Sequence, residues 1–178
     1  MWVPVWVEGW QHQCCGEDFA VGDEVRWTLV EGDEDWHRSV LGEAYPSWEA
    51  DLDLDSDQMV HSGRTETEWV VRRRGGLAVT IVAARDQPGQ TRRVGLPGEE
   101  HHHDAPQGAP QTLGTVRRIR VVYCRYAAPV ASELVEPVPG SATFVDATKA
   151  LKWPDEGDER RFIGYLVDLD VAEDSATA

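Results

Sequence analysis

The stretch TEWVVRRRGGLAVTIVAAR, residues 67–85, is the part of the sequence that decides the fold class. Two runs containing valine, isoleucine and threonine flank the dipeptide Gly75-Gly76, and such β-branched residues favour strands. Glycine adopts the positive φ angles that a tight hairpin turn requires. The stretch therefore predicts two antiparallel strands joined by a two-residue turn.

Further strands are predicted on both sides of this hairpin. The first ten residues, MWVPVWVEGW, alternate tryptophan with valine, which predicts a strand buried on both faces. The segment FAVGDEVRWTLVEG, residues 19–32, predicts a turn at Gly22-Asp23 followed by a strand. The β-branched run at 114–126 and the alternating run at 160–171 predict two more strands.

Short helices and loops are predicted between these strands. Residues 33–41 predict a short helix, because Asp33 can cap its N-terminus and Gly42 can end it. The tripeptide Cys14-Cys15-Gly16 predicts a turn. The segment EADLDLDSD, residues 49–57, has little apolar mass and predicts a solvated loop.

These elements amount to six or seven strands and at most two short helices. The predicted fold class is therefore mostly β, as an antiparallel small β-barrel or sandwich. The segment FAVGDEVRW, with a Gly-Asp turn before a strand, is also similar in pattern to the first strands of OB-like and SH3-like barrels. The length of 178 residues suits one domain. We expect a single β-rich domain over 1–172, with a long loop at 86–111 where Pro, Gly, Gln and charge are frequent, and a frayed tail at 173–178.

The charge of the chain is strongly negative and unevenly distributed. The sequence has 17 Lys and Arg against 32 Asp and Glu, a net charge of −15, which disfavours a protein that coats nucleic acid or membranes. Residues 1–60 carry −13, residues 61–130 carry +5, and residues 131–178 carry −7. The acidic first segment predicts either a solubilising surface or a docking surface for a basic partner.

Cysteine usage and the first residues predict a cytoplasmic protein. Three cysteines, of which Cys14 and Cys15 are adjacent, do not make a disulfide framework. The first ten residues lack the basic start and the apolar run of a secretory signal. No stretch has the roughly 18 consecutive apolar residues that would cross a bilayer.

The segments WQHQCCGEDFAVGDEVRW and HHHDAPQGAPQTLGTVRRIRVV resemble a family of uncharacterised actinobacterial proteins. The N-terminal part of the resemblance is the pattern Trp-Gln-x-x-Cys-Cys-Gly-x-x-Phe-x-Val-Gly-Asp. The resemblance covers about a quarter of the chain and implies no activity, because the family has none assigned. The matching positions are Trp10, Gln11, Cys14, Cys15, Gly16, Phe19, Gly22, Asp23, Val25, Trp27, His101, His102, Pro106, Thr112 and Gly114.

One candidate site consists of thiols and imidazoles. Its members are His12, Cys14 and Cys15 near the start, His101, His102 and His103 in the long loop, and Cys124 on a predicted strand. They could supply the four ligands that zinc prefers, if the loop folds back onto the Cys-Cys turn. The spacing differs from the Cys-x-x-Cys of zinc ribbons, and adjacent cysteines point apart in an extended chain. The alternative is that the cysteines pack as small hydrophobes and the histidines are solvated. A cysteine nucleophile is disfavoured, because the sequence shows no activating partner.

A second candidate site consists of arginines. Arg72 and Arg74 share one face of a predicted strand, and Arg118 and Arg120 share one face of another. If the two strands are neighbours, the four side chains form a cationic strip that could bind an anionic ligand. The alternative is that these arginines neutralise acidic segments of the same molecule.

No motif in the sequence fixes a reaction. The preferred hypothesis is a cytoplasmic binding or interaction protein, which recognises an anionic ligand or a protein partner through the arginine-rich sheet face; whether it is an enzyme stays open. One alternative is a small zinc protein or metal-dependent enzyme, and another is an acidic regulatory protein that docks on a basic partner. Six of the eight tryptophans lie in the first 48 residues, where they could form core or stack on a ligand.

Overall fold

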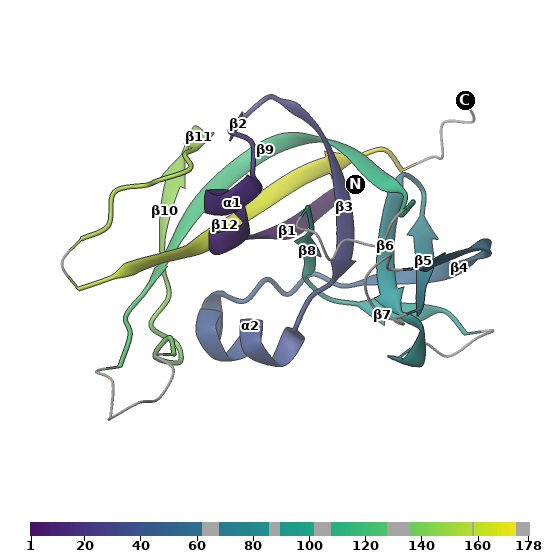
Figure 1. Cartoon of the computed structure of the whole chain (residues 1–178), viewed down its shortest axis with the longest axis horizontal. Coiled ribbons are helices and arrows are strands. Elements are labelled where there is room, and N and C mark those ends of the chain that lie inside the picture. The colour runs from purple at the N-terminus through teal and green to yellow at the C-terminus, as the bar shows by residue number, and fades with distance from the viewer. Residues whose placement is uncertain (62–67, 86–89, 102–107, 128–135, 158, 174–178) are drawn as a thin grey trace.

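The computed structural model describes the chain apart from residues 62–67, 86–89, 102–107, 128–135, 158 and 174–178, and apart from the side chains of 55–61 and 85 (Figure 1). The two α-helices of the described part are α1 (Gly9–Cys15) and α2 (Glu34–Leu41). Short 3-10 turns, η1 and η2, span Gly42–Ala44 and Ala83–Arg85. The strands are β1 (Trp2–Glu8), β2 (Phe19–Ala20), β3 (Glu24–Glu31), β4 (Ala50–His61), β5 (Glu68–Arg74), β6 (Leu77–Val82), β7 (Arg92–Val94), β8 (Pro97–Glu99), β9 (Gln111–Cys124), β10 (Thr143–Ala147), β11 (Lys149–Ala150) and β12 (Arg161–Val171).

Five of the strands are hydrogen-bonded in a closed ring, in the order β9, β12, β1, β8 and β3, with β3 pairing back to β9. β10 adds to the outer edge of β9, and β6, β5, β4 and β7 extend the sheet from β3 (Figure 1). The prediction of a mostly β fold with at most two short helices is confirmed. The sheet is mixed rather than fully antiparallel, because β1 pairs with β8, and β3 with β6, in parallel.

The hairpin that decides the fold class is formed by β5 and β6, with Arg74 opposite Leu77 across the turn. Gly75 takes a positive φ of 57°, as a tight turn requires. A side chain at Gly75 would also clash with the carbonyl oxygen of Glu173. The turn is therefore packed against the segment that follows β12, and glycine is needed there for space as well as for conformation.

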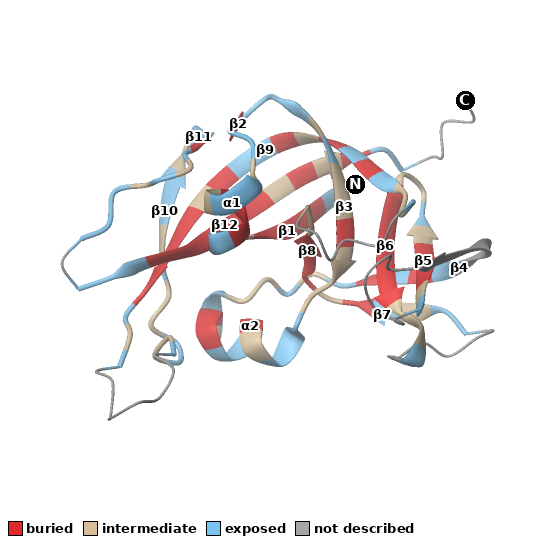
Figure 2. Cartoon of the chain, viewed as in Figure 1, coloured by how far each residue is buried: buried red, intermediate tan, exposed pale blue. Residues whose placement is uncertain are grey.

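The main core cluster joins buried residues of the ring strands β1, β3, β9 and β12 with those of β4, β5 and β6, and Figure 2 shows the buried bands along these strands. Val3, Val5 and Trp6 of β1 are buried, which confirms a strand covered on both faces over most of its length. Trp2 is 59% exposed, and Trp10 falls in α1 rather than in the strand. The tripeptide predicted as a turn closes α1 instead, because α1 runs to Cys15.

Two segments predicted as loops contain strands. Residues 50–54 belong to β4, where Leu52 is fully buried and Asp51 pairs with Arg93 of β7. The alternation of Leu and Asp is a strand pattern whose polar face is exposed. Within the predicted loop 86–111, β7 forms, β8 lies between β1 and β3, and β9 begins at Gln111. Pro97-Gly98-Glu99 has little strand propensity, so pairing with both neighbours decides its structure.

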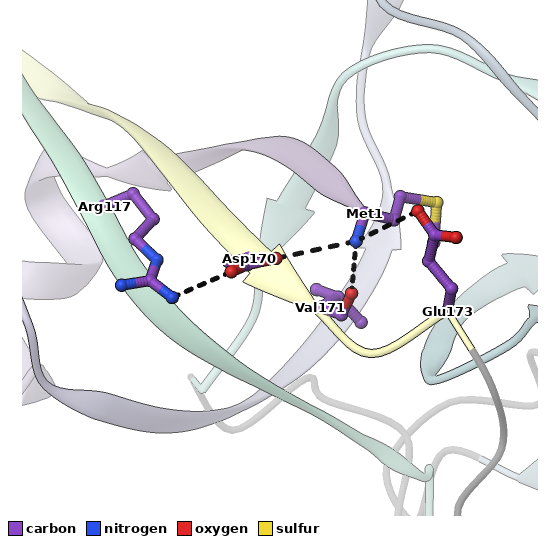
Figure 3. A network of polar contacts seen from close by, with 5 residues as sticks. All are labelled: Met1, Arg117, Asp170, Val171 and Glu173. Atoms are coloured by element: carbon purple, nitrogen blue, oxygen red, sulfur yellow. Dashed lines mark hydrogen bonds and ion pairs between the residues drawn. The ribbon is translucent and has the colours of Figure 1, made fainter.

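The two ends of the described chain are tied together (Figure 3). The amine of Met1 donates a hydrogen bond of 2.6 Å to the carbonyl of Val171. The same amine lies 3.5 Å from the carboxylate of Asp170 and 3.6 Å from that of Glu173, and Arg117 contacts Asp170 at 2.8 Å. Glu173 therefore has defined contacts, and the rest of the predicted frayed tail lies outside the described residues.

Neither α1 nor α2 is long and apolar enough to cross a bilayer, and the same holds for every other helical segment of the described part.

Candidate functional site

A cavity of about 630 Å³ opens where the end of α1 and the loop after it approach β3 and β8. Several residues on which the family resemblance was based line it, among them Cys15, Phe19 and Trp27. The lining combines apolar, acidic and basic side chains with one glycine, and its members are Val7, His12, Cys15, Gly16, Glu17, Asp18, Phe19, Asp23, Glu24, Val25, Arg26, Trp27, Glu99 and His101.

The aromatic wall of the cavity is built from residues of β2 and β3. The rings of Phe19 and Trp27 meet edge to face, with their centroids 5.1 Å apart. Phe19 is buried and Trp27 is half-buried, so part of the indole lies at the cavity. The turn between the two strands carries Gly22 at a φ of 98°, and the carboxylate of Asp23 accepts a 2.8 Å hydrogen bond from the backbone of Ala20. The predicted Gly22-Asp23 turn is therefore confirmed, and it fixes the separation of the two rings.

His12 forms a buried part of the wall. Its ring meets Phe19 at 5.7 Å and Tyr165 at 5.3 Å, both edge to face. Burial lowers the pKa of His12, and its Nε2 has no hydrogen-bond partner within the described residues. A side chain at Gly16 would approach His12 Nδ1 to 2.5 Å, so the glycine after the two cysteines leaves room for this ring.

His101 and Glu99 form an ion pair in the lining. His101 Nδ1 lies 2.6 Å from a carboxylate oxygen of Glu99, and Nε2 lies 3.2 Å from the carbonyl oxygen of Gln11. Both partners are hydrogen-bond acceptors, so the protonated ring, in which both nitrogens donate, suits this position. The bond to Glu99 raises the pKa of His101 above its ordinary value of 6.5. The pair joins β8 to α1 and places the imidazole beside a buried carboxylate.

The Glu99→Gln substitution should remove a defined part of the pH dependence of stability. The pKa of His101 is higher in the folded chain than in the unfolded chain. The stability that its bond to Glu99 contributes is therefore fully present below pH 6.5 and is lost as the pH rises through the raised pKa. We expect the variant to lose about 2 kcal/mol of unfolding free energy at pH 6 and less at pH 9. Urea unfolding at the two pH values measures this. An equal loss at both would contradict the assignment.

The predicted zinc site lies partly outside the residues that the structure describes. Cys14 and Cys15 are exposed, His101 has both ring nitrogens in hydrogen bonds, and His102 and His103 lie outside the described residues. Within the part of the chain that the structure describes, no three His, Cys, Asp or Glu groups are placed to hold a metal ion. The two thiols do not point apart as expected, because the helical backbone brings their sulfur atoms to 2.9 Å.

The four predicted arginines do not form one strip. Arg72 and Arg74 lie on β5, whereas Arg118 and Arg120 lie on β9, and the sheet order places β6 and β3 between these strands. The expectation that the two strands are neighbours is therefore wrong. Arg72 is almost fully buried and donates a 2.7 Å hydrogen bond to the carbonyl of Gln90, while Arg74 is exposed at the end of its strand.

The arginines of β9 contact aspartates on the strands beside it. Arg118 lies 2.7 Å from Asp146 of β10, and Arg120 lies 2.8 Å from Asp168 of β12. The guanidinium of Arg118 lowers the pKa of Asp146. These contacts match the alternative in which the arginines neutralise acidic segments of the same molecule. An anion at Arg118 would have to compete with a carboxylate that is already in place.

Sequence reasoning missed the carboxylates of the cavity. Glu17 and Glu24 count in the sequence analysis only within the general acidity of the first sixty residues, and Glu99 falls in the predicted long loop at 86–111. The local sequence does not predict the position of Glu99, because three residues that include proline and glycine do not predict a central strand. The closure of the ring brings Glu99 to the cavity.

The fold and the site define a small, mostly β protein with a closed ring of strands and an acidic cavity that has an aromatic wall. The chain matches a family of unknown function, DUF6578, over residues 1–171, and it belongs to that family. No curated protein and no solved structure matches the chain. The predicted membership of a family of unknown function is thereby confirmed, while the actinobacterial source and the motif stay predictions.

Proposed function

We propose that the protein binds a small organic cation, such as a protonated amine, in the cavity between α1, β3 and β8. The observation that carries the proposal is that acidic side chains and a half-buried tryptophan line the same cavity. This retains the expectation of a binding protein and changes the charge of the ligand from negative to positive.

The charge balance of the lining favours a cation. Glu99 is balanced by His101. Asp18 is balanced by Lys149 of β11, at 2.8 Å. Three further carboxylates and one guanidinium remain in the lining, which are those of Glu17, Asp23, Glu24 and Arg26. A protonated amine would therefore be attracted on approach and would find oxygen acceptors at the cavity wall.

The aromatic wall supports an organic rather than an inorganic cation. An ammonium group over an indole face is attracted by the ring quadrupole, and the methylene groups of an amine pack on Phe19 and Trp27. The volume of about 630 Å³ is in the range of small-molecule sites. The arginine surface of β9 gives weaker support to a ligand site, because Arg118 and Arg120 already contact aspartates.

Titration calorimetry of the whole chain at low salt tests this function. The probes are spermidine, agmatine and phenylethylamine, each compared with its N-acetylated, uncharged counterpart. We expect at least one amine to bind with an affinity that falls as salt is added, and its acetylated form not to bind. Heat that is equal for the charged and the uncharged forms, or no heat for any amine, would rule out a cation site.

The Glu24→Gln substitution should weaken amine binding by about five- to tenfold, because it removes one charged acceptor from the cavity wall. Glu43→Gln is the matched control, since Glu43 is exposed on the turn at Gly42–Ala44 and changes the net charge by the same amount. Calorimetry of both variants separates a local contact from general electrostatic attraction. If the two variants lose affinity equally, the amine is not bound at this cavity.

A further inference from the structure

The end of α1 presents two thiols at close range. Cys14 and Cys15 are both exposed, and the thiol of Cys15 donates a hydrogen bond of 2.9 Å to the sulfur of Cys14. The third cysteine, Cys124, is fully buried in a cluster with Trp6 and Leu166. The chain therefore offers one pair of accessible, adjacent sulfur atoms and one protected cysteine for comparison.

We propose that Cys14 and Cys15 are a modification site, which oxidises reversibly to a disulfide between neighbouring residues. The oxidant is a low-molecular-weight disulfide. One cysteine thiolate attacks it, forms a mixed disulfide and releases one small thiol. The second cysteine then loses its proton, attacks the sulfur of the first and displaces the other small thiol. Two protons and two electrons leave the protein, and the oxidant is reduced to two thiols.

The geometry favours a disulfide between Cys14 and Cys15 over a lasting mixed disulfide with the small thiol. The sulfur atoms are already within 2.9 Å, and a disulfide bond of about 2.05 Å needs only a small further approach. Cys15 is the last residue of α1, and the exposure of both side chains means that no core contact opposes the change. The hydrogen bond to Cys14 raises the pKa of Cys15, so the reaction should accelerate as the pH rises.

The same geometry makes the disulfide easy to reduce. The Cα atoms of neighbouring residues are about 3.8 Å apart, which is shorter than the roughly 4.4–6.8 Å that disulfides usually span. A bond under such constraint has a more oxidising potential than a structural disulfide. The pair is therefore suited to reversible modification rather than to stabilising the fold.

The modification would also reach the cavity. Cys15 and Gly16 both line it, and the amide of Gly16 donates to the carbonyls of Gln11, at 3.2 Å, and His12, at 3.1 Å. Closing a ring at Cys14 and Cys15 should shift this end of α1. A change in amine affinity on oxidation is thus expected, and that consequence rests on the proposed function, whereas the modification itself does not.

Oxidised glutathione followed by alkylation and mass spectrometry tests the modification without any ligand. We expect the folded protein to lose the mass of two hydrogen atoms, the Cys14–Cys15 peptide to resist alkylation, and dithiothreitol to reverse both changes. Cys124 should be alkylated only after denaturation. A stable glutathione adduct, a disulfide between two chains, or two thiols that stay alkylatable would each overturn the proposal.

The Cys14→Ser and Cys15→Ser variants are the matched tests of the second step. Each retains one exposed thiol, so each should stop at the glutathione adduct and gain its mass. Cys124→Ser should still form the ring, and Cys124→Ala serves in its place if the hydroxyl disturbs the buried site. Two results would show that the two neighbouring thiols are not the reacting pair. One is that the intramolecular disulfide fails to form without Cys124, and the other is that Cys14→Ser or Cys15→Ser gains no glutathione.

Discussion

The Gly164→Ala substitution is expected to lower the free energy of unfolding by about 3 kcal/mol, because β12 passes too close to β1 for any side chain at this position. A methyl group on Gly164 would lie 2.5 Å from the carbonyl oxygen of Val7 and 2.6 Å from the ring of Trp6. The register of β12 against β9 shifts between Phe162 and Gly164, so this is the place where the strand bends. For a chain of this size the melting temperature should fall by about 6–12 °C.

Gly98→Ala is the matched control for this prediction. Gly98 lies on β8, on the other side of β1, and a methyl group there would have only ordinary contacts, 3.8 Å from Val30 and 4.0 Å from Trp6. We expect its unfolding free energy to stay within about 0.5 kcal/mol of the parent chain. Thermal and urea unfolding of both variants measure the difference. A similar loss in both would mean that the replacement of a strand glycine in itself, rather than the close approach at β12, sets the loss of unfolding free energy.

Acid should destabilise the protein between about pH 6.5 and pH 4 through His37 of α2. This ring is 4% exposed, meets Trp6 and Trp36 edge to face, and has no hydrogen-bond partner on either nitrogen within the described residues. Burial lowers the pKa of His37 to about 4, although the nearby Asp33 opposes the shift. The unfolded chain takes up a proton near pH 6.5, and the folded chain does so only near pH 4. Stability is therefore complete above pH 6.5 and falls by about 3 kcal/mol as the pH drops through this window.

The His37→Leu variant should lack this acid-induced loss while remaining stable at neutral pH, because it removes two unpaired buried nitrogens. The pKa of His12 is also lowered, so a smaller loss in the same direction should remain. The stability that His101 contributes is lost as the pH rises above 6.5, so its effect is separate from the acid-induced loss through His37. Urea midpoints from pH 4 to pH 9 measure both. An unchanged acid loss in His37→Leu would show that the ring is already protonated or solvated.

The parts of the fold that the sequence predicts are those with a strong local pattern. The Gly75-Gly76 hairpin, the strand after Gly22-Asp23 and the capped helix that begins after Asp33 all formed as expected. In each case a turn or cap residue and the adjoining periodicity indicate the same structure. The loop predictions at 49–57 and 86–111 miss β4 in the first segment and β7 and β8 in the second, because charge, proline and glycine mask strands whose hydrogen bonds come from distant partners.

Some residues of the candidate site could likewise be selected from the sequence, and others could not. Cys15, Phe19, Trp27 and His101 could be selected from the sequence as unusual residues, and all four line the cavity. The role of Glu99 could not be selected, since its neighbours in the ring lie about seventy and ninety residues away along the chain. The sequence did not predict the pairing of Arg118 with Asp146 either, because this contact depends on β10 pairing with β9.

The sequence by itself determined that this protein is mostly β, where its strongest strands and turns lie, and that its first sixty residues are acidic. These properties follow from residue type and short-range spacing, which act within a few residues. Only the tertiary structure decided which strands close the ring, that the arginines of β9 contact aspartates, and that carboxylates and aromatic rings meet at one cavity. Those properties depend on hydrogen bonds and packing between segments far apart in the chain, and residue spacing carries no information about them.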